Sequence, residues 1–216
     1  MILPAVLGER GSPLRILCLG AHCDDIEIGC GGTVLRLLSE RPGSTVSWVA
    51  LASTPEREKE ARGSAAAFLA GAASSEIVIK QFRDGYLPFQ GIEVKDFFES
   101  LKPARPDVIL THHRHDRHQD HRVVAEMTWN TFRDHLILEY EILKYEGDLG
   151  MPNLFVPLPE ATARKKIALV LDGYPSQRGK RWFRGENFEA VLRLRGLECN
   201  APDGLAEAFH ASKLVM

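Results

Sequence analysis

The sequence predicts an α/β fold in which helices cover both faces of a mostly parallel sheet. The first observation behind this prediction is that short apolar runs, typical of buried strands, alternate with longer stretches whose apolar residues recur at helical spacing. The second is that glycine and proline stand between these stretches, where turns are needed. Such alternation is typical of β-α-β units and therefore of parallel strands.

The first strand and helix are predicted from local composition. Residues 14–19 form an apolar run that ends at Gly20, which predicts a buried strand, and residues 21–32 predict a loop rich in acids and glycine. The helix after this loop stops at Pro42-Gly43. Its apolar side chains at helical spacing are Val34, Leu35, Leu37 and Leu38.

Residues 46–52 predict a second strand, and Thr54-Pro55-Glu56 predicts the start of the helix that follows it. Proline is tolerated in the first turn of a helix, and the helix dipole favours acidic side chains there. An alanine-rich stretch continues this helix until Gly71 ends it.

The remaining elements are predicted on the same grounds. Strands are predicted over residues 76–82, 108–111, 136–143 and 154–156, and helices over residues 94–101, 123–132, 159–171 and 186–194. Asp84-Gly85 predicts a turn after the first of these strands. A histidine-rich loop, residues 112–121, follows the strand over residues 108–111.

Length and composition fit one soluble domain. The chain has 216 residues, of which 44% are hydrophobic and 26% are charged. No repeat or linker divides the sequence. We therefore expect a single domain over residues 1–216, with a lead-in at residues 1–13 and an appended C-terminal layer from about residue 145 to residue 216.

Charge, hydropathy and cysteine pattern argue against several classes of protein. The formal net charge of −2 offers no basic surface for nucleic acid, and no apolar run reaches the length of a membrane span. The N-terminus lacks the pattern of a secretion signal, so a cytoplasmic location is expected. The four cysteines form no C-x-x-C pair, which argues against a cysteine zinc cage.

Two predicted loops, residues 21–32 and 112–121, concentrate the side chains that bind metals. Both loops follow the carboxyl ends of strands, where a doubly wound sheet binds its ligands. A set of two histidines and one aspartate is common for catalytic zinc and leaves a fourth position open for water. We assign this set to His22, Asp25 and His121, because a parallel sheet would bring the two loops together.

Three further residues of these loops are candidates for the chemistry. Asp24 would direct its carboxylate at the water on the metal, as a general base must, and the metal would lower the pKa of that water to about 7. His118 is a candidate to stabilise an oxyanion or to protonate a leaving amine. Asp120 is expected to hydrogen-bond a histidine and fix its tautomer.

The same residues are compatible with plainer roles. Asp24 and Asp25 would suit a helix N-cap and its charged neighbour. Three histidines of the second loop are expected to be bystanders, namely His112, His113 and His115. A phosphate cradle at Gly29, Gly31 and Gly32 is a weak interpretation, because the loop spells neither G-x-G-x-x-G nor a P-loop ending. We expect these glycines to let the loop fold tightly around a metal.

Both loops resemble the motifs of the LmbE-like, or PIG-L-like, N-acetylglucosaminyl deacetylase family. The His-Pro-Asp-Asp-Glu motif of that family stands here as His22-Cys23-Asp24-Asp25-Ile26-Glu27. Its second motif, His-x-x-Asp-x-His-x-Asp-His, stands complete at His113, Asp116, His118, Asp120 and His121. Cys23 replaces the proline, and Ile26 takes the place of the glutamate with Glu27 one position on, but no predicted ligand or base is lost.

The resemblance extends beyond the motifs and covers the chain from Arg15 onward, although it is weaker between Tyr145 and Asp172. Further features that resemble the family are Arg57 with Glu60, Asp84-Gly85, Ser176-Gln177 and Glu207-Ala208-Phe209. The resemblance to the family implies an α/β, Rossmann-like three-layer fold with a mostly parallel sheet and an appended C-terminal layer.

The resemblance also implies roles for single residues. The implied zinc ligands are His22, Asp25 and His121, the base is Asp24, and the acid or oxyanion residue is His118, supported by Asp120. Arg57 and Asp84 would contact sugar hydroxyls. The implied cofactor is one Zn²⁺ per chain, although such a site also accepts other divalent metals such as Fe²⁺.

We therefore expect a hydrolase that removes an acetyl group from a small N-acetylated amino sugar or its conjugate. A homo-oligomer is compatible with the resemblance. One alternative is a zinc hydrolase of another amide or ester. Another is a metal- or sugar-binding module, against which Asp24 argues because a structural zinc site has no use for a free base. A third is a nucleotide-binding protein that uses Gly31-Gly32.

Overall fold

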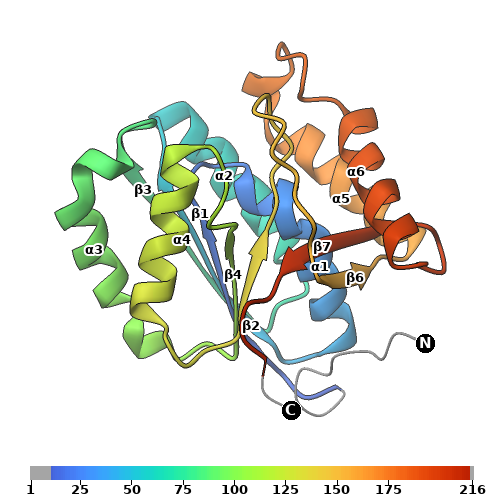
Figure 1. The fold of residues 1–216 in the computed structure, drawn as a ribbon, viewed down its shortest axis with the longest axis horizontal. Coiled ribbons are helices and arrows are strands. Elements are labelled where there is room, and N and C mark those ends of the chain that lie inside the picture. Colours follow the sequence, from blue (N-terminus) through green and yellow to red (C-terminus); the bar gives the residue numbers. More distant parts are fainter. Residues whose placement is uncertain (1–10, 215–216) are drawn as a thin grey trace.

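The computed structural model describes residues 11–214 and confirms the predicted α/β fold. One mixed sheet carries helices on both of its faces (Figure 1). The lead-in expected over residues 1–13 lies almost wholly outside the described residues. Within the described range, no helix is both long enough and apolar enough to cross a membrane.

The sheet has seven strands within the described residues, in the order β3-β2-β1-β4-β5-β7-β6. The five parallel strands are β1 (Arg15–Gly20), β2 (Thr45–Ala52), β3 (Ser74–Phe82), β4 (Val108–His112) and β5 (Ile137–Tyr140). The two strands that run antiparallel to their neighbours are β6 (Leu154–Pro157) and β7 (Ala206–His210). The order of the parallel strands reverses between β1 and β4, so a crevice is expected at their carboxyl ends.

The helices divide between the two faces of the sheet (Figure 1). One face is covered by α1 (Asp25–Glu40), α2 (Pro55–Phe68), α5 (Glu160–Gly173) and α6 (Gly185–Glu198). The other is covered by α3 (Gly91–Ser100) and α4 (Gln119–Thr131). Between residues 11 and 214, three short 3-10 helices connect these elements, namely η1 (Leu87–Gln90), η2 (Lys102–Ala104) and η3 (Pro175–Gln177).

The apolar run of strand β1 contributes side chains to the hydrophobic cores on both faces of the sheet. Ile16 and Cys18 pack into the core beneath α1 and α2, whereas Leu17 and Leu19 pack into the core beneath α3 and α4. Side chains of a strand alternate between its faces, so a strand buried on both sides is apolar throughout. Each such leucine contributes about 1.5–3 kcal/mol through burial.

The start of α1 corrects one expectation. The helix begins at Asp25 rather than after residue 32, so the three glycines expected in a metal-binding loop lie inside it. A Cβ atom on Gly29 would stand 2.2 Å from the ring of Tyr140, and one on Gly31 would stand 2.6 Å from Phe68. These glycines therefore serve close packing of α1 and do not wrap a metal.

The C-terminal part of the chain adds β6 and β7 to the same sheet, and β7 was not predicted. This strand has the sequence Ala-Glu-Ala-Phe-His, which offers little apolar alternation to detect. The division of residues 1–216 into a lead-in, a domain body and an appended layer stays a prediction.

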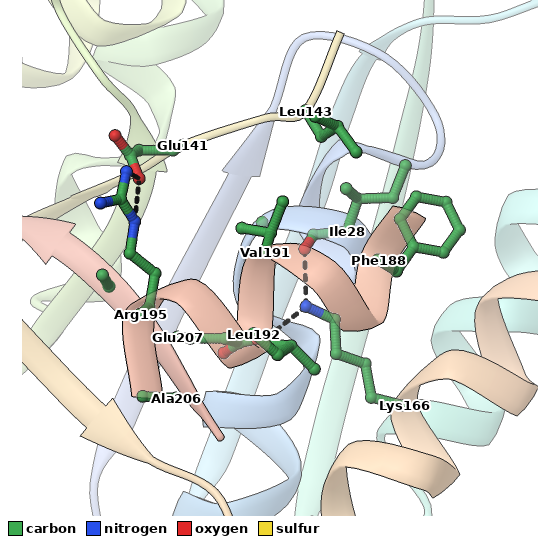
Figure 2. Close-up of a pocket in the computed structure, with 12 residues that line it drawn as sticks. Ile28, Glu141, Leu143, Lys166, Phe188, Val191, Leu192, Arg195, Ala206 and Glu207 are labelled. Carbon is green, nitrogen blue, oxygen red and sulfur yellow. Dashed lines mark hydrogen bonds and ion pairs between the residues drawn. The ribbon is translucent and has the colours of Figure 1, made fainter. Parts of the chain in front are cut away.

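A buried ion pair ties this C-terminal part to α1. The Lys166 ammonium lies 2.5 Å from Oε1 of Glu207 on β7 and donates to the carbonyl oxygen of Ile28 on α1 at 2.6 Å (Figure 2). The Glu207 carboxylate also accepts from the backbone N–H groups of Gly32 and Thr33, at 2.9 and 2.6 Å. The pair lines a small cavity of about 30 Å³ between α1, α6 and β7.

Candidate metal centre and active site

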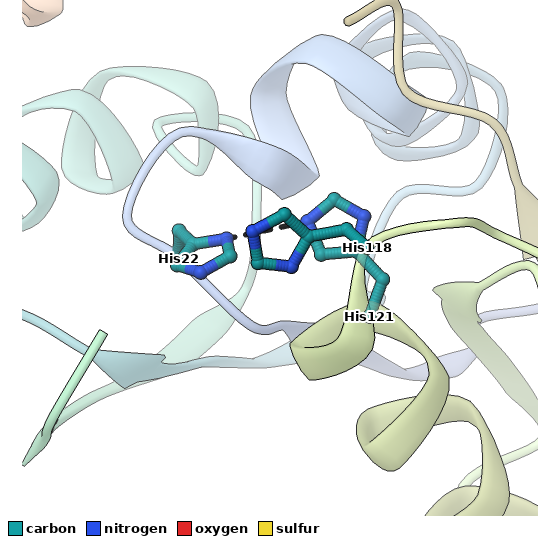
Figure 3. A group of neighbouring side chains, drawn as sticks. All are labelled: His22, His118 and His121. Atoms are coloured by element: carbon teal, nitrogen blue, oxygen red, sulfur yellow. Dashed lines mark hydrogen bonds between the residues drawn. The ribbon is translucent and has the colours of Figure 1, made fainter. Parts of the chain in front are cut away.

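The two motif-bearing loops meet at the crevice between β1 and β4. His22 lies between the end of β1 and the start of α1, and Asp25 is the first residue of α1. His118 caps α4, and His121 lies in its first turn. Figure 3 shows the three histidine rings gathered between the β1–α1 connection and the start of α4. The topology thus brings together residues almost a hundred positions apart.

The three expected metal ligands present their donor atoms to one another. Nδ1 of His22 lies 3.2 Å from Oδ2 of Asp25 and 3.2 Å from Nε2 of His121. Nε2 of His121 lies 3.6 Å from Oδ1 of Asp25. Neighbouring ligand atoms around tetrahedral zinc lie about 3.3 Å apart when the bonds are about 2.0–2.1 Å long. The separations between these side chains are of that size, although Asp25 makes its two contacts through different oxygens of its carboxylate.

The far nitrogen of each of these histidines faces a carboxylate. Nδ1 of His121 lies 3.0 Å from Oδ2 of Asp116. Nε2 of His22 lies 3.1 Å from Asp84 and 3.3 Å from Asp120. A carboxylate at the far nitrogen keeps the proton there and leaves the lone pair of the near nitrogen for a metal. Carboxylates in this position are typical of metal-binding histidines, so this pattern also fits a divalent cation.

The two histidines differ in their affinity for a proton. Burial, aided by the neighbouring His112, lowers the pKa of His121 to about 3, so its ring is neutral. Burial also disfavours the charged form of His22, but Asp25 and the carboxylates at its far side outweigh it and raise its pKa well above the ordinary value. A cation that bound here would compete with the proton of His22.

Other combinations of side chains in this region bring one ligand atom from each residue within 4.8 Å of the others. The three groups found among the described residues are His22 with His118 and His121, Asp25 with His112 and His121, and His22 with Asp84 and Asp120. All three share members with the expected set, so they describe one compact cluster.

Asp24, the expected base, is buried beside this cluster, with 6% of its surface exposed. Nη2 of Arg57 lies 2.9 Å from its Oδ1 atom. Burial raises the pKa of Asp24, and the guanidinium of Arg57 opposes that rise. Arg57, which was expected to contact sugar hydroxyls, thus forms an ion pair with the expected base, Asp24.

His118 and Asp120 lie where the sequence suggested, although their pairing differs. The ring of His118 lies 4.8 Å from that of His22 and 4.6 Å from that of His121. Burial and the nearby His22 lower the pKa of His118. The carboxylate of Asp120 contacts His22 rather than His118, which instead accepts a hydrogen bond from the backbone N–H of Asp120.

The Asp84-Gly85 turn is held against the cluster by Asp120. The carboxylate of Asp120 accepts from the backbone N–H of Gly85 at 2.7 Å and from that of Leu87 at 3.2 Å. In this position, Oδ1 of Asp84 lies 3.1 Å from Nε2 of His22, while 78% of the Asp84 side chain is exposed. Asp84 therefore faces both the cluster and the solvent.

His112 was expected to be a bystander, but it lies in the cluster. Its ring is fully buried and stacks on that of His121 at 3.9 Å. Its Nε2 lies 3.0 Å from Oδ2 of Asp25 and accepts from the backbone N–H of Ala21 at 2.9 Å. The signal for this placement was its position at the end of a buried strand that enters the loop.

The other two histidines of the loop lie away from the ligands. His113 pairs with Glu139 at 2.8 Å and stacks on His210 at 3.8 Å. His115 is exposed. Asp116, which the motif contains but to which no role was assigned, is the partner of His121.

The two departures from the family motif, Cys23 and Ile26, are buried in the core beneath α1 and α2. The Cys23 thiol faces the carbonyl oxygen of Ala52 at 3.6 Å, and burial raises its pKa to about 12. Glu27 is fully buried and accepts from the Tyr174 hydroxyl at 2.5 Å, while burial raises its pKa to about 8. The contacts of Cys23 and Glu27 are thus with Ala52 and Tyr174 and not with the expected metal ligands.

Comparison with known families gives one match over more than half of the chain. The family model described as PIG-L, GlcNAc-PI de-N-acetylase, matches residues 17–132 of the 216. The matched segment contains all the residues of the cluster.

Solved structures of similar fold cover nearly the whole chain. The conserved protein TT1542 from Thermus thermophilus is 24% identical, with a TM-score of 0.72 over 94% of this chain and 96% of that one. The N,N'-diacetylchitobiose deacetylase from Pyrococcus horikoshii is 19% identical, with a TM-score of 0.69 over 94% and 84%. GalB, the 4-carboxy-2-hydroxymuconate hydratase from Pseudomonas putida, is 16% identical, with a TM-score of 0.72 over 94% and 97%. At these identities the likeness concerns the fold.

Proposed function

Because the chain belongs to the PIG-L family, we propose that it is a metal-dependent hydrolase that removes the acetyl group from an N-acetylated amino sugar or a conjugate of one. The observation that carries this proposal is the convergence of His22, Asp25 and His121 at 3.2 to 3.6 Å, with Asp24 buried beside them. A cytoplasmic location and assembly into homo-oligomers stay predictions.

We assign the metal to these three residues and propose Zn²⁺, one per chain, with Fe²⁺ as the alternative that the same ligands accept. The bound ion would supply Lewis acidity toward water and toward the acetyl carbonyl group. The carboxylates of Asp116 and Asp120 would hold the rings of His121 and His22 in the orientation that binding requires.

Asp24 is the residue to which we assign the proton of the attacking water. The water oxygen forms a bond to the acetyl carbonyl carbon while its proton passes to the carboxylate of Asp24. Burial of the Asp24 carboxylate raises its pKa, which favours uptake of a proton. The C–N bond then breaks, the proton passes to the departing amine, and acetate is the second product.

His118 is assigned to the carbonyl oxygen or to the departing amine. Its lowered pKa keeps the ring neutral near pH 7, and a neutral ring can donate one hydrogen bond to an oxygen that gains negative charge. Asp84 is assigned to a substrate hydroxyl, because its side chain is largely exposed at the edge of the cluster.

The fold alone does not choose the reaction, since a hydratase shares it. Other amides and esters are the competing substrates, and they need the same activated water. Acetamido sugars are favoured here by the family, by the complete second motif and by the first motif, which keeps His22, Asp24 and Asp25.

Acetate release from a panel of N-acetyl sugars, sugar nucleotides and sugar conjugates tests the proposal. We expect release from at least one member, loss of release after metal removal and recovery with Zn²⁺. His121→Ala should abolish both metal binding and release, and the matched control His115→Ala, in the same loop but exposed, should change neither. Protein that carries one metal per chain yet leaves the whole panel intact would refute the proposed substrate class.

A further inference from the structure

The connection between α5 and α6 concentrates positive charge. Residues 178–184 read Arg-Gly-Lys-Arg-Trp-Phe-Arg, so four of these seven residues are cationic in a chain whose formal net charge is −2. All four cationic side chains are exposed. We call residues 178–184 the cationic loop.

Carboxylates of the protein neutralise little of this charge. Arg178 lies 3.7 Å from Asp172, in a contact where both side chains are largely exposed. Within residues 11–214, no carboxylate lies at ion-pair distance from Lys180, Arg181 or Arg184. The cationic loop therefore keeps positive charge that an external anion can neutralise.

The cationic loop is fixed at both ends to residues 23–28, the segment that carries the expected base. Before the loop, the fully buried Tyr174 donates to the carbonyl oxygen of Cys23. After the loop, Phe188 lines the same small cavity as Ile28 (Figure 2). Figure 1 shows the α5–α6 connection at the end of the molecule toward which the parallel strands point. The loop thus stands at the crevice end of the sheet.

A second set of contacts places the loop next to the expected position of the sugar. Glu60 on α2 accepts from the backbone N–H of Ser176 at 2.8 Å and from its hydroxyl at 2.6 Å. Oγ of Ser176 also lies 3.4 Å from Nη1 of Arg57, which was expected to contact sugar hydroxyls and which pairs with Asp24. The cationic loop begins two residues after Ser176, so its first Cα atom lies within about 8 Å of that residue.

The interior of the crevice, in contrast, is rich in negative charge. The carboxylates at the cluster belong to Asp24, Asp25, Asp84, Asp116 and Asp120. A crevice lined by one sign of charge repels a ligand group of the same sign. An anionic group attached to the sugar is therefore directed away from these carboxylates and toward the cationic loop.

On the basis of the proposed function, we propose that the cationic loop binds a phosphate group of the substrate, which makes phosphorylated conjugates of an N-acetylated amino sugar the substrate class. A phosphate carries up to two negative charges and three acceptor oxygens, so it suits several cations at once. Arginine binds phosphate through two parallel hydrogen bonds. Trp182 packs against the core beneath α1 and α2, which holds the loop that carries Arg181 and Arg184.

The decisive experiment measures kcat/KM of the metal-loaded protein for N-acetylglucosamine 1-phosphate, for UDP-N-acetylglucosamine and for the neutral methyl glycoside. We expect at least one phosphorylated compound to be preferred over the neutral one. The double variant Arg181→Ala/Arg184→Ala should lower this preference about 10-fold, because it removes two exposed cations from the phosphate. Arg181→Lys/Arg184→Lys should restore part of it, and about 0.5 M NaCl should weaken it in the wild type.

The matched control is Arg133→Ala/Lys165→Ala, which removes the same charge from two exposed positions outside the loop and should keep the preference. Calorimetric titration with glucosamine 1-phosphate, the amine that deacetylation would produce, gives a second readout without turnover. Its Kd should rise about 10-fold in the loop variant and stay constant in the control.

A preference that the loop variant leaves intact, or that the control lowers equally, would overturn the proposal. Sedimentation with vesicles of phosphatidylcholine and phosphatidylserine separates a lipid headgroup from a soluble conjugate. Vesicle binding that depends on the loop, without any preference among the soluble compounds, would also overturn it. Wild-type protein that releases no acetate would instead refute the proposed function, and the titration would still test the loop.

Discussion

The Oδ2 atom of Asp116 lies 3.0 Å from Nδ1 of His121, on the nitrogen that does not face His22. The same oxygen lies 2.8 Å from the ammonium of Lys144, and Oδ1 accepts from the backbone N–H of His118. Burial disfavours the charged carboxylate of Asp116, yet His121 and Lys144 hold its pKa well below the usual range. Asp116 is therefore an anion that fixes the orientation of one expected ligand.

Asp116→Asn should weaken metal binding about 10- to 100-fold, because the amide no longer offers a charged acceptor at that oxygen. Titration of the metal-free protein with Zn²⁺ in competition with a chelator measures the change. Asp148→Asn is the matched control, because Asp148 also contacts Lys144, at 2.6 Å, and has no contact with the histidine ring. Equal affinity of the wild type and Asp116→Asn would show that the carboxylate plays no part in ligand orientation.

Lys166→Met should destabilise the protein by about 3–5 kcal/mol, since it leaves the buried carboxylate of Glu207 without its countercharge. The adjacent Lys165→Met, on an exposed side chain, should change the free energy of unfolding by less than about 0.5 kcal/mol. Urea unfolding of the two variants at one pH gives the comparison. Similar stabilities would contradict the view that this pair fastens the C-terminal part to α1.

Gly29→Ala should destabilise the protein by about 1–3 kcal/mol, because the added methyl group meets the ring of Tyr140. That ring is fully buried, and its hydroxyl donates to the carbonyl oxygen of Leu19 at 2.7 Å, so it has little room to move. Gly63→Ala on α2 meets no atom within 4 Å and should stabilise the protein by up to about 1 kcal/mol. Thermal unfolding should therefore separate the two variants in opposite directions.

Low pH should destabilise the folded protein, in part because the carboxylate of Glu139 becomes protonated. Burial alone would raise the pKa of this carboxyl, but hydrogen bonds from His113, Arg114 and Trp129 outweigh it and lower the pKa to about 2. A carboxyl whose pKa is lower in the folded state stabilises that state above its unfolded pKa of about 4.3, and this contribution is lost as the pH falls toward 2. The lost contribution is about 3 kcal/mol.

Glu139→Gln should therefore be less stable than the wild type at pH 7 and should lose less stability between pH 5 and pH 3. Urea unfolding across this range measures both effects. Glu126→Gln, at an exposed position of α4, should follow the wild-type curve. A Glu139→Gln curve parallel to that of the wild type would rule out this carboxyl as a source of acid sensitivity.

The sequence predicted the parallel half of the fold well, because its strands are buried on both faces and carry continuous apolar runs. The convergence of His22 and His121 followed from the same topology, since ligands of a doubly wound sheet gather at the carboxyl ends of its strands. The start of α1 was misplaced because glycines usually mark loops, whereas Gly29 and Gly31 serve close packing.

Contacts between distant segments could not be predicted in the same way. The pairing of β7 with β5 depends on tertiary structure, and the strand itself is short and partly charged. Nothing in local sequence places Tyr174 against Cys23, or His112 on Asp25. These contacts arise from the packing of whole helices and strands against one another. Local patterns in a single sequence do not reveal this packing.

The link from Tyr174 and Ser176 to Asp24 has a consequence for biogenesis. A ribosome makes the metal-binding motifs first and the segment that supports Arg57 later. A nascent or proteolytically shortened chain that ends before this segment would thus carry every expected ligand and the base, yet lack the contacts of Tyr174 with Cys23 and of Ser176 with Glu60. The loop that carries the expected ligands would then be fastened from both sides only after synthesis of the C-terminal part.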